Sequence, residues 1–287
     1  MTSKHYIVSR FNLRLWTEDK KGNMTQTEAW LKRRFELFET YCMSSVAKQT
    51  CLDFTWLVLF DEDVKENYSD KLQEYQQWCP QFTPVFIQRE YSRKYVACLR
   101  EYIEKELKNE KEKGRNYQQV ITTYLDNDDA LSIDYVQRVQ DCAQNLSYTT
   151  FVTFLYGIQY FEERNLATRV KAPANHFISL VEDLRYGEPV RTVYCYGGHS
   201  LIYKYRKVIP IYEIWNHGEE AWMEVVHENN VVNDFLKRRM HYVVSNQNLL
   251  KERYGIEQTL THRWAFVDYG WLFVKFLKSV WRHVKKS

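Results

Sequence analysis

The order of hydrophobic and polar residues in the first half of the chain predicts strands that alternate with helices. Short apolar stretches predict strands at HYIVSRFN, TWLVLFD, TPVFIQ and QQVITTYLD, which begin at His5, Thr55, Thr83 and Gln118. Apolar residues at helical spacing, and charged stretches between strands, predict helices at about residues 31–46, 68–79, 100–115 and 131–145. This alternation is typical of an α/β fold with a mostly parallel sheet and helices on both faces.

The pattern changes after about residue 147. Residues 148–170 predict paired strands, TVYCYGGH (192–199) and AWMEVVHENN (221–230) predict further strand-like pieces, and SLVED (179–183) predicts a short helical or loop element. No internal repeat and no linker rich in Pro, Gly or Ser separates the two halves. We therefore expect one catalytic domain over residues 1–240, followed by a C-terminal helical extension over residues 241–287.

The composition is that of a globular protein: 45% of the 287 residues are hydrophobic and 27% are charged. A net charge of +3 is too small to indicate a nucleic-acid partner, and we expect none. The six cysteines are scattered without a C-x-x-C pair, which favours reduced thiols over a zinc site or a disulfide framework. The N-terminus does not resemble a signal peptide, and no run approaches the ~20 apolar residues of a membrane span. The expected location is cytoplasmic.

The stretch VITTYLDNDDALS places Asp126, Asn127, Asp128 and Asp129 directly after a predicted strand. Three carboxylates within four residues repel one another unless a cation or the solvent takes up the charge. A solvated turn that caps the next helix is one interpretation, because Asp and Asn are common at such positions. A metal site is the other, because a turn can direct both Asp126 and Asp128 at one Mg²⁺ or Mn²⁺ ion.

Two common kinds of site do not fit this stretch. Counted from Asp126, an EF-hand needs Gly where Leu131 stands and Glu where Gln137 stands, and no Walker-type phosphate loop is present. A D-x-D type of metal–pyrophosphate site remains. Ligands of open α/β sheets bind beyond the carboxyl ends of the strands, where we also expect Asp61 and the segment Arg10–Asn12.

Several segments, in this order, resemble the rhamnosyltransferase family of bacterial glycosyltransferases, which are nucleotide-diphospho-sugar transferases of the GT-A fold. They are SRFN (9–12), QTCLDFTWLVLFD (49–61), ITTYLDNDDAL (121–131), FISLVED (177–183) and WMEVVHENN (222–230). The resemblance covers roughly residues 4 to 235. Two departures bear on donor or acceptor preference: Tyr124 stands where Arg is expected, and Glu228 and Asn229 stand where small residues are more usual.

The resemblance implies a divalent cation, Mn²⁺ or Mg²⁺, that bridges the two phosphates of a nucleotide-sugar donor. Asp128 is the expected principal ligand, with Asp126 beside it, and His227 can complete the coordination. The alternative for His227 is a hydrogen-bonded histidine at a strand end.

The resemblance also implies a site for the nucleotide part of the donor. Asp61 is expected to accept a hydrogen bond from the base, and Arg10 and Asn12 are expected to hold the base or the pyrophosphate. Asp126 and Asn127 are expected to contact the donor as well. A structural salt bridge is the alternative for Arg10.

Glu182 and Asp183 stand where inverting GT-A enzymes often place the carboxylate that deprotonates the acceptor hydroxyl. The alternative is a charge pair at the end of a helix. Trp222 can stack on a sugar, although core packing is the more ordinary role of a tryptophan.

The C-terminal stretch YGWLFVKFLKSVWRHVKKS predicts an amphipathic helix. One side of it carries Phe273, Val274, Phe276, Leu277, Val280, Trp281 and Val284, and the other carries Lys275, Lys278, Arg282, Lys285 and Lys286. Such a helix suits the surface of an anionic membrane. A helix docked on the catalytic domain, with its basic side in water, is the rival interpretation.

Taken together, the sequence predicts a metal-dependent, inverting glycosyltransferase that acts on a glycan or lipid-linked acceptor, with rhamnose as one possible sugar. A sugar nucleotidyltransferase is the first alternative, although the first strand lacks a Gly-rich, basic phosphate loop. A non-enzymatic protein that binds glycans or membrane surfaces is the second.

Overall fold

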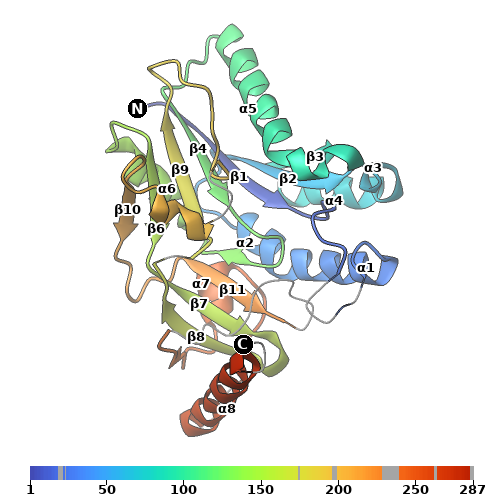
Figure 1. The fold of residues 1–287 in the computed structure, drawn as a ribbon, viewed down its shortest axis with the longest axis vertical. Coiled ribbons are helices and arrows are strands. Elements are labelled where there is room, and N and C mark those ends of the chain that lie inside the picture. Colours follow the sequence, from blue (N-terminus) through green and yellow to red (C-terminus); the bar gives the residue numbers. More distant parts are fainter. Residues whose placement is uncertain are drawn as a thin grey trace.

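The computed structural model describes residues 1–18, 22, 24–173, 175–195, 199–227, 239–261 and 264–284, with only the backbone at 199–201 and 279–284. Two β-sheets form the body of the molecule (Figure 1). The first sheet has seven strands in the order β10-β6-β9-β4-β1-β2-β3, and the second has five in the order β12-β8-β7-β11-β5. The strands are β1 (Ser3–Arg10), β2 (Thr55–Asp61), β3 (Phe82–Ile87), β4 (Gln119–Tyr124), β5 (Ala130–Leu131), β6 (Thr150–Phe154), β7 (Tyr156–Phe161), β8 (Leu166–Lys171), β9 (Ile178–Asp183), β10 (Ile211–Ile214), β11 (Trp222–Val226) and β12 (Tyr242–Val243).

Helices surround the first sheet and end the chain. They are α1 (Glu28–Leu37), α2 (Ser44–Val46), α3 (Val64–Asn67), α4 (Ser69–Trp78), α5 (Tyr95–Glu112), α6 (Tyr135–Gln144), α7 (Leu249–Tyr254) and α8 (Ala265–Val284). Shorter π-helical or 3-10 segments lie at Phe38–Met43, Arg89–Lys94, Glu162–Arg164 and His199–Lys204.

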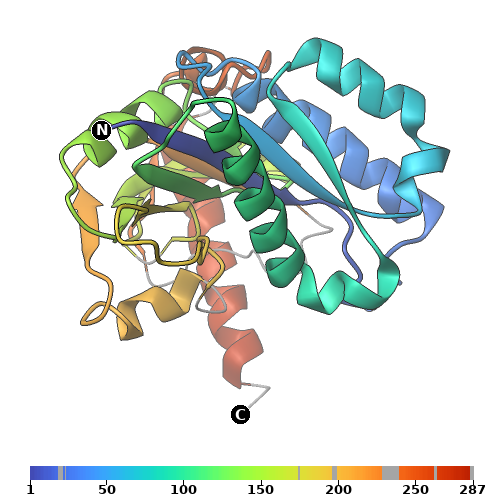
Figure 2. The ribbon, with the colours of Figure 1, turned by 90° about the horizontal axis from the view of Figure 1, so that it is seen from above.

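Successive residues of the central strands pack on opposite faces of the first sheet, as the pleat of a strand requires. Ile7 of β1 belongs to the core that contains Phe35 of α1, whereas its neighbours Tyr6 and Val8 belong to the core that contains Leu99 of α5. Figures 1 and 2 show α5 on one face of this sheet and α1 with α4 on the other. A strand buried on both faces is mostly apolar, which explains the apolar runs Tyr6–Val8 of β1 and Trp56–Phe60 of β2.

The carboxyl ends of β1, β2 and β4 meet at one edge of the first sheet. β1 is parallel to both neighbours, with Val8 paired to Tyr124 and Arg10 paired to Leu59. The acidic residues that follow β4 therefore lie beside the last residues of β1 and β2. The predicted fold class, a mostly parallel α/β sheet flanked by helices with a C-terminal helix, is confirmed.

Two predictions for the second half of the chain are wrong. SLVED is not a helix or loop but most of β9, which runs antiparallel to β4 and β6 in the middle of the first sheet. The described part of TVYCYGGH is not a strand, because Thr192 has a left-handed backbone (φ 65°) and turns follow it. Residues 196–198 of that stretch lie outside the described residues.

The direction of β9 also contradicts the predicted role of Glu182 and Asp183. Glu182 pairs with Val120 and Asp183 with Gln119, at the first residues of β4. Asp126 lies six residues beyond Val120, or about 20 Å along an extended strand. Both carboxylates thus lie at the opposite end of the sheet from the acidic residues, too far away to act as a base at the site predicted there. Asp183 forms an ion pair with Arg185 instead.

Residues after 240 contribute to the second sheet before the polypeptide leaves the body. β12 pairs with β8, and Leu250 and Tyr254 of α7 belong to the same core as Ile158 of β7. The first turns of α8 pack on the second sheet, and the rest of the helix extends away from the body (Figure 2). The domain boundary at residue 240 stays a prediction.

Glu182 is buried at the end of β9 and has an unusual pKa. Its two carboxylate oxygens accept hydrogen bonds from the backbone N–H groups of Arg191 (2.7 Å) and Thr192 (3.0 Å). Burial favours the neutral acid more than these bonds favour the carboxylate, and it raises the pKa of Glu182 to about 7.

This pKa predicts that stability falls as the pH rises through the range in which Glu182 ionises. The native pKa lies above the ordinary value of 4.5, so the resulting stabilisation is complete below about pH 4.5 and is lost as the pH approaches 7. Relative to Glu182→Gln, which cannot ionise, the wild type should lose up to about 3 kcal/mol of unfolding free energy over this range. Urea denaturation from pH 4.5 to 8 measures the difference. The exposed-site control Glu112→Gln should keep the wild-type slope, and a Glu182→Gln slope equal to that of the wild type would contradict the assignment.

Candidate functional site

The acidic loop, residues 126–129, is not a solvated turn. Asn127 and Asp128 are 6% and 5% exposed, and Asp129 is fully buried. Asp126 is partly exposed, with 28% of its side chain accessible. Because buried carboxylates need compensating charge, the structure around the loop has to supply cations.

Asp126 is compensated by Arg10, the last residue of β1. The Asp126 Oδ1 atom accepts hydrogen bonds from Arg10 Nη2 (3.2 Å) and from the Tyr124 hydroxyl (2.8 Å). Arg10 also donates a hydrogen bond to that hydroxyl. Burial of Arg10 opposes its charge, but Tyr124 and Asp126 outweigh burial and raise the pKa of Arg10 well above its ordinary value. Tyr124, which departs from the family pattern, is thus part of the acidic site.

Four aromatic rings enclose the Arg10 guanidinium. The central carbon lies 5.2 Å from the ring centroid of Tyr124 and 5.7–5.8 Å from those of Trp16, Tyr95 and Tyr194. These distances suit cation–π attraction. The structural salt bridge named as the alternative for Arg10 is present, and the rings pack around its guanidinium; a role in binding the donor stays a prediction.

Asp128 is compensated from two other elements. Its Oδ2 atom lies 2.7 Å from Arg34 Nη1 of α1 and 2.9 Å from His227 Nε2, directly after β11. Burial would raise the pKa of Asp128, but Arg34 and His227 outweigh it, so the pKa lies below its ordinary value. His227 thus contacts the acidic loop through a hydrogen bond at a strand end, although 99 residues separate the two along the sequence, and its role as a metal ligand stays a prediction.

Asn127 connects the loop to the end of β1. Its amide donates to the backbone oxygens of Arg10 (2.9 Å) and Phe11 (2.6 Å), and its Oδ1 atom accepts from Arg34 (3.1 Å). These bonds use both the NH₂ group and the oxygen of the side-chain amide, and they hold the turn that carries Asp126, Asp128 and Asp129.

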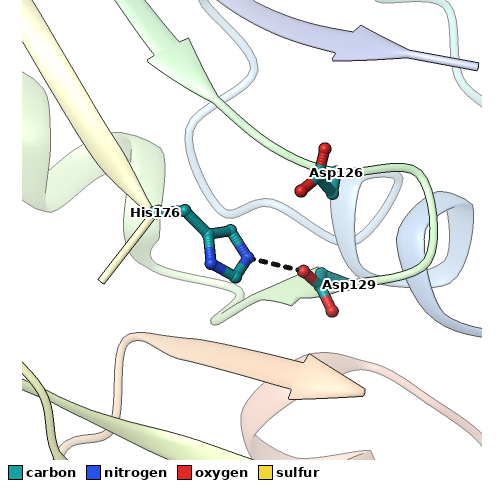
Figure 3. A group of neighbouring side chains, drawn as sticks. All are labelled: Asp126, Asp129 and His176. Carbon is teal, nitrogen blue, oxygen red and sulfur yellow. Dashed lines mark hydrogen bonds and ion pairs between the residues drawn. The ribbon is translucent and has the colours of Figure 1, made fainter. Parts of the chain in front are cut away.

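Asp129 is paired with His176, just before β9. His176 Nε2 lies 2.7 Å from Asp129 Oδ2, and the Val225 N–H of β11 donates to Oδ1 (2.8 Å). Burial would lower the pKa of His176, but the hydrogen bond and charge of Asp129 prevail and raise it to about 9. Figure 3 shows the His176 ring directed at Asp129 with Asp126 close by. His176 is therefore a third cation at the site.

These residues fit a divalent cation by their chemistry. One ligand atom each from Asp126, Asp129 and His176 can be chosen so that all lie within 4.8 Å of one another (Figure 3). Asp128 and His227 form a second convergent pair beside them. Carboxylate oxygens suit Mg²⁺ and Mn²⁺, and neutral imidazole nitrogen suits transition metals, so the cluster of Asp126, Asp129 and His176 can hold such an ion if His176 gives up its proton.

Asn12 and Asp61 lie at the same edge of the first sheet as the acidic loop. Their side chains form hydrogen bonds with residues at or after the ends of β1 and β2. Asn12 Oδ1 accepts the Asp61 N–H (3.0 Å), and Asp61 accepts from Arg14 Nε (2.8 Å) and the Asp63 N–H (3.2 Å). Both side chains are buried. The structure thus brings the ends of β1 and β2 together as predicted, and Arg14 is the partner that the sequence did not indicate.

Sequence reasoning missed Arg34, His176 and the role of Asp129. Arg34 stands beside Phe35 on the inward side of a predicted helix, and a charged residue at such a position is a weak signal of a buried partner. His176 precedes a segment whose pattern does not predict a strand, so nothing indicates its direction. Asp129 is part of the acidic motif, but the motif does not show its partner.

The comparison with family models agrees with the resemblance seen in the motifs. A family model described as "Putative rhamnosyl transferase" matches residues 8–239, which include Arg10, the acidic loop and His227. No curated protein matches this sequence. Among solved structures, it is similar to a crystal structure titled "putative nucleotide-diphospho-sugar transferase" from Desulfovibrio desulfuricans G20. The identity is 10% and the TM-score 0.35, over 80% of this chain and 84% of that chain.

The family match covers most of the sequence and favours sugar transfer over the nucleotidyltransferase and non-enzymatic alternatives. The protein therefore belongs to the rhamnosyl transferase family and is a glycosyltransferase.

Proposed function

We propose that this protein transfers a sugar from a nucleoside-diphosphate donor to a hydroxyl group of a glycan or lipid-linked acceptor. The family name suggests rhamnose as the sugar. The observation that supports the proposal most is the buried acidic loop, balanced by cations, at the edge where β1, β2 and β4 end. Open α/β sheets bind their ligands at such an edge.

We propose Asp128 and His227 as ligands of Mg²⁺ or Mn²⁺, together with Asp126 of the same loop, whose carboxylate converges with Asp129 and His176. The ion, when bound, neutralises charge on the donor phosphates and on the leaving nucleoside diphosphate. In the structure, Arg34 supplies the positive charge next to Asp128. A metal ion at Asp128 would take over part of the charge balance that Arg34 provides in the metal-free protein.

We propose that Arg10, Asn12 and Asp61 receive the nucleotide. Arg10 is held by aromatic rings beside Asp126, so its charge is positioned for a phosphate or base. Asn12 and Asp61 fix the neighbouring strand end. Asn127 acts through the loop backbone rather than by reaching outward, because its amide bonds are internal.

Inversion at the sugar carbon requires a base close to the acceptor hydroxyl, and Glu182 and Asp183 are too far away. We propose Glu224 of β11 as this base. It lies on the same side of β11 as Trp222, whose ring stacks on Phe177 (5.1 Å), and Phe177 in turn stacks on His176 (4.2 Å). The next residue, Val225, donates its N–H to Asp129 (2.8 Å), so Glu224 lies near the acidic loop. Gln159 donates to the Glu224 carboxylate (3.0 Å) and can orient it.

A cytoplasmic location remains part of the proposal. The six cysteines are free thiols, and Cys42 and Cys79 are buried. Free thiols are usual in a reducing compartment. Among the described residues, no helix is both long and apolar enough to cross a membrane.

The first prediction from this proposal concerns metal-dependent donor binding. Calorimetry with the common nucleoside diphosphates should show binding to one of them in Mn²⁺ and loss of binding in EDTA. Asp128→Asn should weaken that binding by about 100-fold, because the variant loses a charged ligand. The exposed-site control Asp70→Asn should bind like the wild type. Full binding in EDTA would refute the metal site, and no binding under any condition would refute the proposed function.

The second prediction concerns the charge balance at Asp128. Arg34→Ala leaves a buried carboxylate with less compensation and should cost the metal-free protein about 3 kcal/mol of unfolding free energy. Mn²⁺ should then raise the melting temperature more in Arg34→Ala than in the wild type, because the ion replaces the missing charge. Arg33→Ala, whose partners are Glu36 and Glu162, is the control. Equal Mn²⁺ effects in all three proteins would show that the ion binds elsewhere.

The third prediction concerns the base. Glu224→Gln should slow transfer by about 100-fold or more while donor binding survives, because the variant cannot take up the proton of the acceptor. Glu182→Gln should keep transfer within about threefold of the wild type, since that carboxylate lies at the far end of the sheet. The opposite result for the two variants would restore the assignment made from sequence.

A further inference from the structure

The last helix, α8, docks on the second sheet by one side. Leu272 packs against Phe161, Leu166 and Val226, and Asp268 forms an ion pair with Arg164 (3.1 Å). Trp271 packs edge-on against Phe161 (5.1 Å), and Lys275 forms an ion pair with Glu163. These four α8 residues are spaced by three and four, so they form one inner face.

The opposite side of α8, its outer face, is apolar and exposed. Phe266, Phe273 and Leu277 are 73%, 60% and 49% exposed, and Val274 and Phe276 flank them at 46% and 39%. Trp264, directly before the helix, is 74% exposed. Single exposed apolar residues are ordinary, but a continuous row of this kind marks an interaction surface.

The charge of this segment restricts what can cover the outer face. Between Trp264 and Ser287 the sequence has one acidic residue, Asp268, and five basic residues, Lys275, Lys278, Arg282, Lys285 and Lys286. Asp268 is 2% exposed and paired with Arg164, Lys275 is paired with Glu163, and Lys278 is exposed. The side chains beyond residue 278 lie outside the described residues. The partner of this surface should therefore combine an apolar interior with negative charge.

We propose that the outer face of α8 binds an anionic lipid membrane, with the helix lying along the membrane surface. The 20 residues of α8 form a rod about 30 Å long. An amphipathic helix with aromatic residues on one side and Lys or Arg on the other binds in this way, with its apolar face roughly 5–10 Å into the headgroup boundary. Pairing with α8 of a second copy fits less well, because that would bring two basic segments together with no free acidic residue between them.

The position of α8 would bring the acidic loop close to the membrane. Leu272 of the inner face packs against Val226, and the next residue, His227, contacts Asp128. This step rests on the proposed function: an acceptor linked to a lipid would meet the site at the surface to which α8 binds. Membrane binding itself does not depend on it.

Vesicle sedimentation of the full-length protein, without donor or metal, tests the proposal. Vesicles of phosphatidylcholine with phosphatidylglycerol should bind the protein, and vesicles of phosphatidylcholine alone should bind it much less. Binding should weaken at about 1 M salt, where the Debye length falls to about 3 Å. The double variant Phe273→Ser/Leu277→Ser should lower the bound fraction by about tenfold, because it removes apolar contacts from the outer face.

A matched control and a second measurement keep the outcomes distinct. Leu52→Ser/Tyr186→Ser removes two exposed apolar side chains elsewhere, 59% and 77% exposed, and should bind vesicles like the wild type. Circular dichroism and light scattering of all variants show whether each is folded and monomeric. Absent binding to anionic vesicles, or equal binding by the wild type and the Phe273→Ser/Leu277→Ser variant, overturns the proposal. A wild-type dimer that this variant converts to a monomer, without vesicle binding, would assign the face to a second copy instead.

Discussion

The buried negative charge of the acidic loop is the constraint on which the rest of the site depends. Asp128 and Asp129 are buried next to the partly buried Asp126, and like charges in a poorly solvated place repel strongly. Each carboxylate has its own cationic partner: Arg10 for Asp126, Arg34 for Asp128 and His176 for Asp129. The partners come from β1, from α1 and from the segment before β9. Pairing each carboxylate of the loop with its cation therefore fixes the positions of these three elements relative to the end of β4.

The same loop joins the two sheets. Asp129 leads into β5, which pairs with β11, and it accepts the Val225 N–H of β11 as well. Trp222 of β11 stacks on Phe177, next to β9 of the first sheet. Gly157 makes room for that ring, since a Cβ atom there would lie 2.0 Å from the Trp222 side chain. The position of His227 at the end of β11 thus follows from contacts along the whole strand, which is why a distant histidine can reach Asp128.

The sequence predicts the parts of the fold and site that local pattern controls. The apolar runs of β1, β2 and β4 identify buried strands, and their polar ends identify Arg10, Asp61 and the acidic loop as neighbours. No local pattern in the sequence shows whether a strand runs parallel or antiparallel to its neighbours in the sheet. The prediction of a helix or loop at SLVED, and of Glu182 at the site, is wrong because nothing in the sequence shows that β9 runs antiparallel to β4. The partners Arg34 and His176 escape prediction for a related reason: a buried ion pair depends on tertiary packing, not on the spacing of residues along the sequence.

The charge balance has a consequence for how a metal ion and a nucleotide would enter. Arg34 and His227 already contact the Asp128 oxygen on which the proposed metal depends, so an ion alone must compete with a buried ion pair. A donor diphosphate changes that competition, because its oxygens offer the Arg34 guanidinium another anionic partner. Metal and donor would then bind more tightly together than either binds alone, with the coupling set by the cost of moving one guanidinium group. If the proposed function holds, the cations around the loop would do more than hold the unliganded fold, since they would also make the site selective for an ion that arrives with a diphosphate.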